Sequence, residues 1–273
     1  MNLELAQIVT LITHGNEYLS LSQKDIFELF PLHLTFMNVC DVSFHKGKKP
    51  DDILERSQVV AKEPHSWFLH LETEGIQYLK LGIVSFKSHP QEQVTSKYAG
   101  NGTRVIQTDK QTCWQSHWSL KNPRDPQGRI WAVGYWEGSN LPVITSFPDI
   151  KTAYQDLESS LTEAQIYSKK CMIDWEKYFA EAIELLNCPN PVPPYYTDLL
   201  PDTYENIKGR QLLAGALKAW VFGGMGSWND VYITDPLQIK EYQQISTNLY
   251  KAIIQSVFAV TNSTAGCWLE VAN

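Results

Sequence analysis

The feature that most constrains the fold is a change of hydrophobic period, from helical to alternating near residue 65 and back to helical near residue 149. Between these points, apolar residues recur at every second position in short segments separated by glycine, proline and asparagine. The connections are too short for crossover helices, so we expect antiparallel neighbours. The pattern predicts five strands, at 66–71, 77–86, 104–108, 113–120 and 129–136.

Helical patterns flank this block on both sides. Before it we expect a helix from Leu3 to near Gly15, a short helix over 24–30, an extended stretch over 34–44 and a helix over 50–61. After it, helical spacing runs from 150 to about 187, as one helix or as two separated near Ser159. The expected class is therefore α+β, with a central antiparallel sheet, short N-terminal helices and a helical C-terminal half packed on one face or end.

A proline-rich stretch at 187–196 divides the helical part of the chain. We expect an α+β region at 1–187 and a helical region at 188–273 that packs on it, so that the two form one compact domain. The proline-rich stretch then crosses the surface as a semi-rigid strap, because the helices after it are too apolar to stand alone.

The most distinctive segment joins the last two predicted helices, which span 204–222 and begin again at Pro236. Asp202 or Thr203 is the expected N-cap of the first helix, and Gly223 its left-handed C-terminal cap. Asp235 directly before a proline is a strong start signal for the second helix.

Between these helices lies Phe222-Gly-Gly-Met-Gly-Ser-Trp-Asn-Asp230, whose glycines are costly in backbone entropy unless the conformation is needed. One interpretation is a nest of backbone N–H groups that binds an anion or a peptide group, with Asn229 and Asp230 as polar contacts. The other is a structural corner in which the glycines allow a tight turn and the two tryptophans of the stretch, Trp220 and Trp228, fill the core. The spacing matches neither the phosphate-binding loop nor the dinucleotide fingerprint.

Charge restricts the class of partner. The formal net charge is −7, and residues 151–273 carry 9 basic against 14 acidic side chains. The absence of a Lys/Arg-rich stripe argues against nucleic-acid binding, and the acidic excess favours a basic protein partner. We expect no membrane span and no signal peptide, because no apolar run is long enough and Met1–Thr13 lacks a basic region. Five cysteines without a close pair indicate reduced thiols in a cytoplasm.

No catalytic motif is assembled in the sequence, and we expect no cofactor. His70 and His117 lie in predicted strands and could meet as an acid-base pair or a two-histidine metal site, although unrelated histidines are the more common case. Glu137 beside Trp136 and Asp230 beside Trp228 are a conceivable glycosidase pair, because sugar sites use carboxylates next to aromatic rings. Five of the nine tryptophans fall in the predicted sheet, where packing against helices is a commoner use than ligand binding: Trp67, Trp114, Trp118, Trp131 and Trp136.

The Phe222–Asp230 segment, followed by a tyrosine-bearing helix, resembles the C-terminal signature of uncharacterised bacterial immunity proteins from polymorphic-toxin and contact-dependent inhibition systems. The resemblance covers about residues 204–260. It implies a cytoplasmic protein that binds a toxin domain tightly and covers its active site, and it brings no catalytic residues.

Acidic side chains would then meet a basic toxin surface, and aromatic side chains would anchor it. The predicted partner-binding residues are Trp228, Asn229, Asp230, Asp235, Trp136 and Glu137. The competing hypothesis is a small-molecule or glycan-processing enzyme, or a binder, with its site between the Gly223–Asp230 loop and the tryptophan-bearing sheet.

Overall fold

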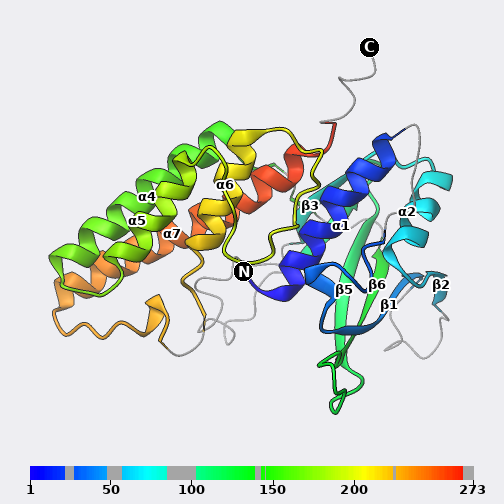
Figure 1. The fold of residues 1–273 in the computed structure, drawn as a ribbon, viewed down its shortest axis with the longest axis horizontal. Coiled ribbons are helices and arrows are strands. Elements are labelled where there is room, and N and C mark those ends of the chain that lie inside the picture. The colour runs from blue at the N-terminus through cyan, green and yellow to red at the C-terminus, as the bar shows by residue number, and fades with distance from the viewer. Residues whose placement is uncertain are drawn as a thin grey trace.

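The computed structural model describes residues 1–21, 28–47, 57–84, 103–138, 143–144, 146–223 and 226–266. Its class is α+β, as predicted, and Figure 1 shows a sheet with α1 and α2 at one end of the molecule and the long helices α4 to α7 at the other. In chain order the elements are α1 (Leu3–Ser20), η1 (Leu34–Phe36), β1 (Val39–Lys46), β2 (Gln58–Ala61), α2 (Pro64–Thr73), β3 (Leu79–Val84), β4 (Thr103–Thr108), β5 (Cys113–Leu120), β6 (Trp131–Gly138), β7 (Val143–Ile144), α4 (Ile150–Lys170), α5 (Glu176–Asn187), α6 (Ile207–Lys218), η3 (Trp228–Asp230) and α7 (Pro236–Ser263).

The sheet has seven strands in the order β2-β1-β6-β5-β4-β3-β7, and it is mixed. Five of its pairs are antiparallel, but β1 and β6 are parallel, with Phe44 opposite Tyr135. The prediction of a wholly antiparallel sheet of about five strands was therefore wrong. It considered only consecutive segments, whereas β1 pairs with a strand far along the chain: Phe44 lies opposite Tyr135, 135 − 44 = 91 residues later.

The predicted strand at 66–71 is instead part of helix α2. Pro64 occupies the first turn, where its missing N–H leaves no hydrogen bond unmade. Trp67, Phe68 and Leu71 are all buried, at spacings of one and four residues that place them on a single helix face. The same residues also satisfy a loose alternation, which is why the period alone did not separate helix from strand.

Helices α1 and α2 cover one face of the sheet. On that face Phe44 stacks on Trp67 of α2 with ring centroids 4.5 Å apart and on Tyr135 of β6 at 5.1 Å. The Tyr135 hydroxyl donates to Gln7 of α1 at 2.6 Å. Helix α1 continues to Ser20, so Gly15 lies inside the helix and does not end it as predicted. A Cβ at Gly15 would lie 2.8 Å from the side chain of Leu79. Glycine here lets the helix approach β3 closely.

Two asparagines complete the backbone pairing of β3 and attach two helices to it. Asn16 of α1 accepts from the N–H of Leu79 at 2.6 Å and donates to its carbonyl at 3.0 Å. Asn262 of α7 does the same for Leu81, at 2.7 and 3.1 Å. Strand β7 pairs with β3 only at residues 83 and 84, so the carboxamides take the place of a longer neighbouring strand.

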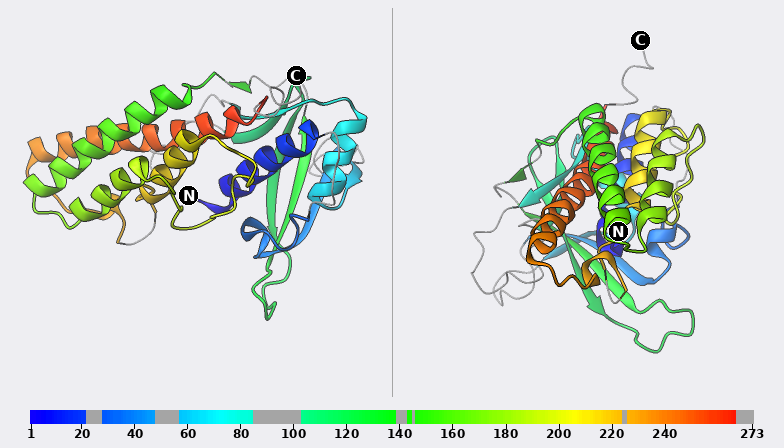
Figure 2. Two further views of the ribbon diagram at one scale, coloured as in Figure 1. Left: turned by 45° about the horizontal axis from the view of Figure 1, so that its top comes forward. Right: turned by 90° about the vertical axis from the view of Figure 1, so that its left-hand side faces the viewer.

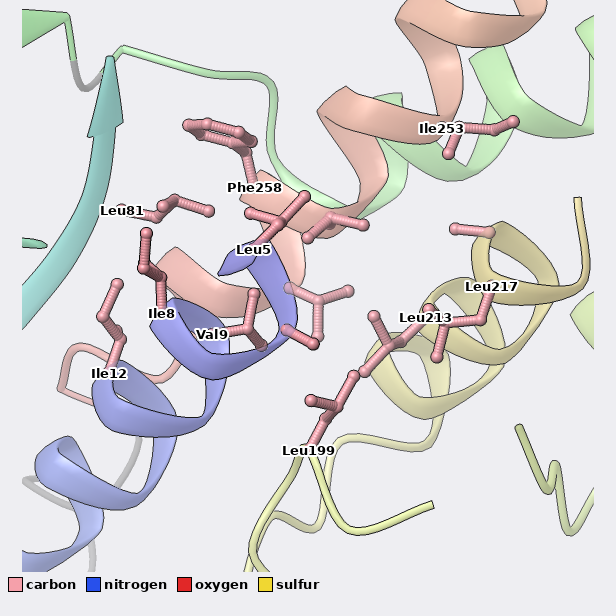
Figure 3. Close-up of a cluster of buried hydrophobic side chains, with 14 of the residues drawn as sticks. Leu5, Ile8, Val9, Ile12, Leu81, Leu199, Leu213, Leu217, Ile253 and Phe258 are labelled. Atoms are coloured by element: carbon pink, nitrogen blue, oxygen red, sulfur yellow. The ribbon is translucent and has the colours of Figure 1, made fainter. Parts of the chain in front are cut away.

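The four long helices form a bundle in which α4 packs on α5 and α7, and α6 packs on α5 and α7 (Figure 2). The predicted regional boundary at residue 187 falls inside this bundle, between α5 and α6. One buried cluster nevertheless runs from α1 to the bundle: Figure 3 shows Leu5, Val9, Leu199, Leu213 and Ile253 in the same apolar region. The chain after Asn187 contacts both parts: the Tyr195 hydroxyl accepts from the Met1 amino group at 2.7 Å and donates to the carbonyl of Leu217 in α6 at 2.8 Å.

Several predicted boundaries moved. The long C-terminal helix divides at 171–175, between α4 and α5, and not near Ser159. Asn206, rather than Asp202 or Thr203, caps the start of α6, and that helix ends at Lys218 with Ala219, not Gly223, as its C-terminal cap. The start of α7 at Asp235-Pro236 is confirmed. The helix predicted over 24–30 lies mostly outside the described residues, as does 50–56 of the helix predicted over 50–61, while 58–61 forms β2.

Candidate functional site

The glycine-containing loop is an internally bonded corner in its described part, Gly223 and 226–230. Gly226 has φ +81°, a value that favours glycine. The Asp230 carboxylate accepts from the N–H of Ser227 at 3.2 Å, and the Asn229 carboxamide accepts from the Ser227 hydroxyl at 2.9 Å and bonds Gly223. Both side chains are exposed, but these hydrogen bonds lie within the loop.

Trp228 is fully buried and presents no surface to a partner, which corrects its prediction as a partner-binding residue. Its ring lies 5.1 Å from Phe179 of α5 and 5.1 Å from Tyr242 of α7, and its Nε1 donates to Ser246 Oγ at 2.7 Å. The indole therefore fixes the corner to the bundle. Among the described residues, the ring partners of Trp228 are Tyr167, Trp175, Phe179 and Tyr242, all in or next to α4, α5 and α7.

Trp136 and Glu137 are neighbours on β6 and point to opposite faces of the sheet. Glu137 shares its face with Tyr135, which meets α1, whereas Trp136 lies on the other face. The Trp136 ring stacks on His45 at 4.5 Å and lies over Gly134, where any Cβ would collide with it. Only glycine at position 134 leaves room for the Trp136 ring to stack on His45.

His70 and His117 do not meet. His70 belongs to α2 on the helix-covered face, and His117 alternates with Ser116, whose hydroxyl reaches Glu4 of α1, so His117 faces the other way. Within the described ranges, no group of three or more histidine, cysteine or acidic side chains is arranged to hold a metal ion.

A buried polar junction, which the sequence analysis did not identify, ties the strap to the N-terminal half. The carbonyl of Asp198 lies 2.9 Å from Nε2 of His14 and 2.9 Å from Nε2 of His33. Both Nε2 atoms must carry a proton to donate to it, while His33 Nδ1 accepts from the N–H of Thr35 at 3.2 Å. Burial lowers the pKa of His14 to about 3 and also lowers that of His33, so both rings are neutral near pH 7. The junction is structural, since its rings are enclosed.

The end of the bundle far from the sheet exposes large apolar side chains. Met172 is 93% exposed, Tyr232 89%, Leu237 80% and Ile166 62%. We call these four residues the bundle tip. They come from α4, the α4–α5 turn, the 231–235 segment and the start of α7, and Figures 1 and 2 place these segments together at the free end of the bundle. Exposed apolar groups gathered in one place are typical of interaction surfaces.

Met172 also occupies an unfavourable backbone position. It follows the cap of α4 with φ +52°, and the N–H of Ile173 bonds the carbonyl of Ser168 while its own N–H bonds that of Lys169. This is the Schellman ending, in which the position of Met172 is normally glycine. A side chain with a Cβ costs about 1 kcal/mol there. Since Met172 is almost wholly exposed, intramolecular packing does not explain why a methionine stands there.

Beside the tip, α4 and α7 enclose an open groove of about 580 Å³, which we call the α4–α7 groove. Tyr167 and Ile245 form part of its base, and the Tyr167 hydroxyl donates to the carbonyl of Gln238 at 3.0 Å. Lys170 and Glu241 form an ion pair across it at 2.8 Å. The remaining lining residues are Glu163, Ile166, Leu237, Lys240 and Gln244.

The exposed predicted residues lie near this end of the bundle. Asn229 and Asp230 directly follow Trp228, whose ring contacts Tyr167 and whose carbonyl accepts from the Tyr242 hydroxyl. Asp235 is exposed and caps α7 by accepting from the N–H of Leu237 at 2.8 Å. This end of the molecule therefore places the carboxylates of Asp230 and Asp235 beside the apolar bundle tip, and none of the four tip residues was among the predicted partner-binding residues.

Comparison with known proteins gave no match to a family model, to a curated protein or to a solved structure. Among the helices of the described ranges, none combines the length and apolarity needed to cross a bilayer.

Proposed function

We propose that this chain is a bacterial cytoplasmic immunity protein, which binds a toxin domain with a basic surface and covers its active site. The observation that carries the proposal is Met172, an apolar side chain that is 93% exposed at a position where glycine would be less strained. A residue that is unfavourable for folding and makes little use of intramolecular packing is best explained by an external contact.

Charge supports a basic partner. The C-terminal part of the chain, from residue 151, has 14 acidic against 9 basic side chains. Asp230 and Asp235 are exposed beside the bundle tip, where they would attract a basic surface during encounter. Met172 and Tyr232 would supply the apolar anchors, because a few large side chains carry most of the energy of a protein interface. Trp136 and Glu137 lie on the sheet and stay predictions without a place in this surface.

The test is binding of the toxin domain encoded beside the gene, measured by isothermal titration with wild-type protein and with Met172→Gly. The variant relieves the left-handed strain, so it should be at least as stable as wild type while its toxin affinity falls at least about tenfold. Gln111→Gly is the matched control, because Gln111 also has positive φ, +62°, but lies in the β4–β5 turn of the sheet. Its affinity should not change.

Two results would refute the proposal. Absence of nanomolar-range binding to any such toxin domain would remove the immunity function itself. Equal weakening by both glycine variants would instead show that the change in affinity does not come from the bundle tip.

A further inference from the structure

The side chains that line the α4–α7 groove recur at helical spacing along both of its walls. Ile166 and Lys170 are four residues apart on α4, and Leu237, Glu241 and Ile245 follow one another at the same interval on α7. Each wall therefore offers one ridge of side chains along a helix axis, and the space between two such ridges is where another helix packs. A turn or two of helix would fill the groove.

The groove has an apolar base and charged rims. Apolar surface is contributed by Ile166, Tyr167, Leu237 and Ile245, of which Leu237 and Ile166 are among the most exposed apolar residues of the described chain. Lys170 and Glu241 neutralise each other at 2.8 Å. Glu163 on one rim and Lys240 on the other form no ion pair with the described residues, so each offers a charge to a ligand.

We infer that the α4–α7 groove binds an amphipathic helix of the partner protein. The occupant has apolar side chains at i, i+3 or i+4 and i+7 along one face, a basic residue opposite Glu163 and an acidic residue opposite Lys240. This inference rests on the proposed function, because it states which part of a protein partner the bundle would hold. The Lys170–Glu241 pair stays in place and limits how deep the helix can enter.

The test uses an 18-residue helical peptide as the probe. It carries leucines along one face, one lysine set to face Glu163 and one glutamate set to face Lys240, and a fluorescent label reports binding by anisotropy. A second peptide of the same composition has its leucines scattered around the helix. Wild-type protein should bind the first peptide and bind the second at least about tenfold more weakly.

Leu237→Glu blocks the groove with little risk to the fold, because Leu237 is 80% exposed in the first turn of α7, where a carboxylate complements the helix dipole. This variant should lose at least about tenfold in affinity for the leucine-faced peptide. Leu120→Glu is the control, since Leu120 is an apolar side chain, 55% exposed at the end of β5, that does not line the groove. It should leave peptide binding unchanged.

The inference is overturned if the leucine-faced peptide does not bind, or if it binds wild type and Leu237→Glu equally. Titration of the toxin domain in parallel separates the two proposals. If the protein binds the toxin domain but not the leucine-faced peptide, the groove proposal is refuted and the immunity function stands. If it binds the peptide but not the toxin domain, the immunity function is refuted and the groove still binds a helix, from a partner that is not this toxin.

Discussion

Replacing Trp228 tests whether it belongs to the core or to an interface. The side chain is fully buried among rings from α4, α5 and α7, and its indole N–H is bonded to Ser246. Removing a large buried aromatic side chain costs about 3–5 kcal/mol of unfolding free energy, so Trp228→Ala should lose that amount. Trp228→Phe keeps most of the apolar area but leaves the Ser246 hydroxyl without its donor, which should cost about 1–3 kcal/mol.

The assay is urea unfolding followed by circular dichroism, with toxin binding measured by titration at a concentration of urea where each variant stays folded. Trp228→Phe should bind the toxin domain as wild type does. Trp136→Ala is the comparison, because Trp136 is only half-buried, and it should lose less unfolding free energy than Trp228→Ala. The reasoning is refuted if Trp228→Ala loses less than about 1 kcal/mol, since a buried aromatic anchor cannot be removed so cheaply.

Two further predictions concern the attachments of the helices. Asn262→Ala leaves the N–H and carbonyl of Leu81 without their partners and should lower the unfolding free energy by about 1–3 kcal/mol, while Thr247→Ala on an exposed position of the same helix should leave it unchanged in the same urea titration. Burial lowers the pKa of His14 in the folded state from 6.5 to about 3. Below pH 6.5 the unfolded chain therefore binds a proton at His14 that the folded chain does not bind, so the free energy of unfolding decreases as the pH is lowered. Urea midpoints between pH 6.5 and pH 4 should show a wild-type decline that is shallower in His14→Gln; an equal decline would contradict the assignment. Glu17, whose pKa burial raises, opposes this trend in both proteins.

The sequence predicted an element correctly where residues within that element determine its structure. The proline at 236 after an aspartate predicted the start of α7, and alternation between breakers predicted β3 to β6. The same reasoning failed at α2. Residues 66–71 fit both the helical and the alternating period, and the helix is the structure that stacks Trp67 on Phe44. The parallel pairing of β1 with β6 depends on contacts distant in sequence, which periodicity does not contain.

In the candidate site, too, some features follow from local sequence and others depend on tertiary packing. Exposure of Asn229, Asp230 and Asp235 agrees with their polarity, but the burial of Trp228 depends on three helices, α4, α5 and α7, that meet around it. Met172 was not predicted as a site residue because nothing local marks it. Its significance comes from a left-handed backbone at the end of α4 together with an exposed side chain, and both are properties of the folded chain.

Hydrogen exchange of the complex with the toxin domain, followed by mass spectrometry, tests the central claim most directly. Amides at 163–173 and 231–245 should gain protection on binding, because these segments carry the bundle tip and the α4–α7 groove. Protection confined to the sheet around Trp136, with none at the bundle end, would contradict the proposed binding surface.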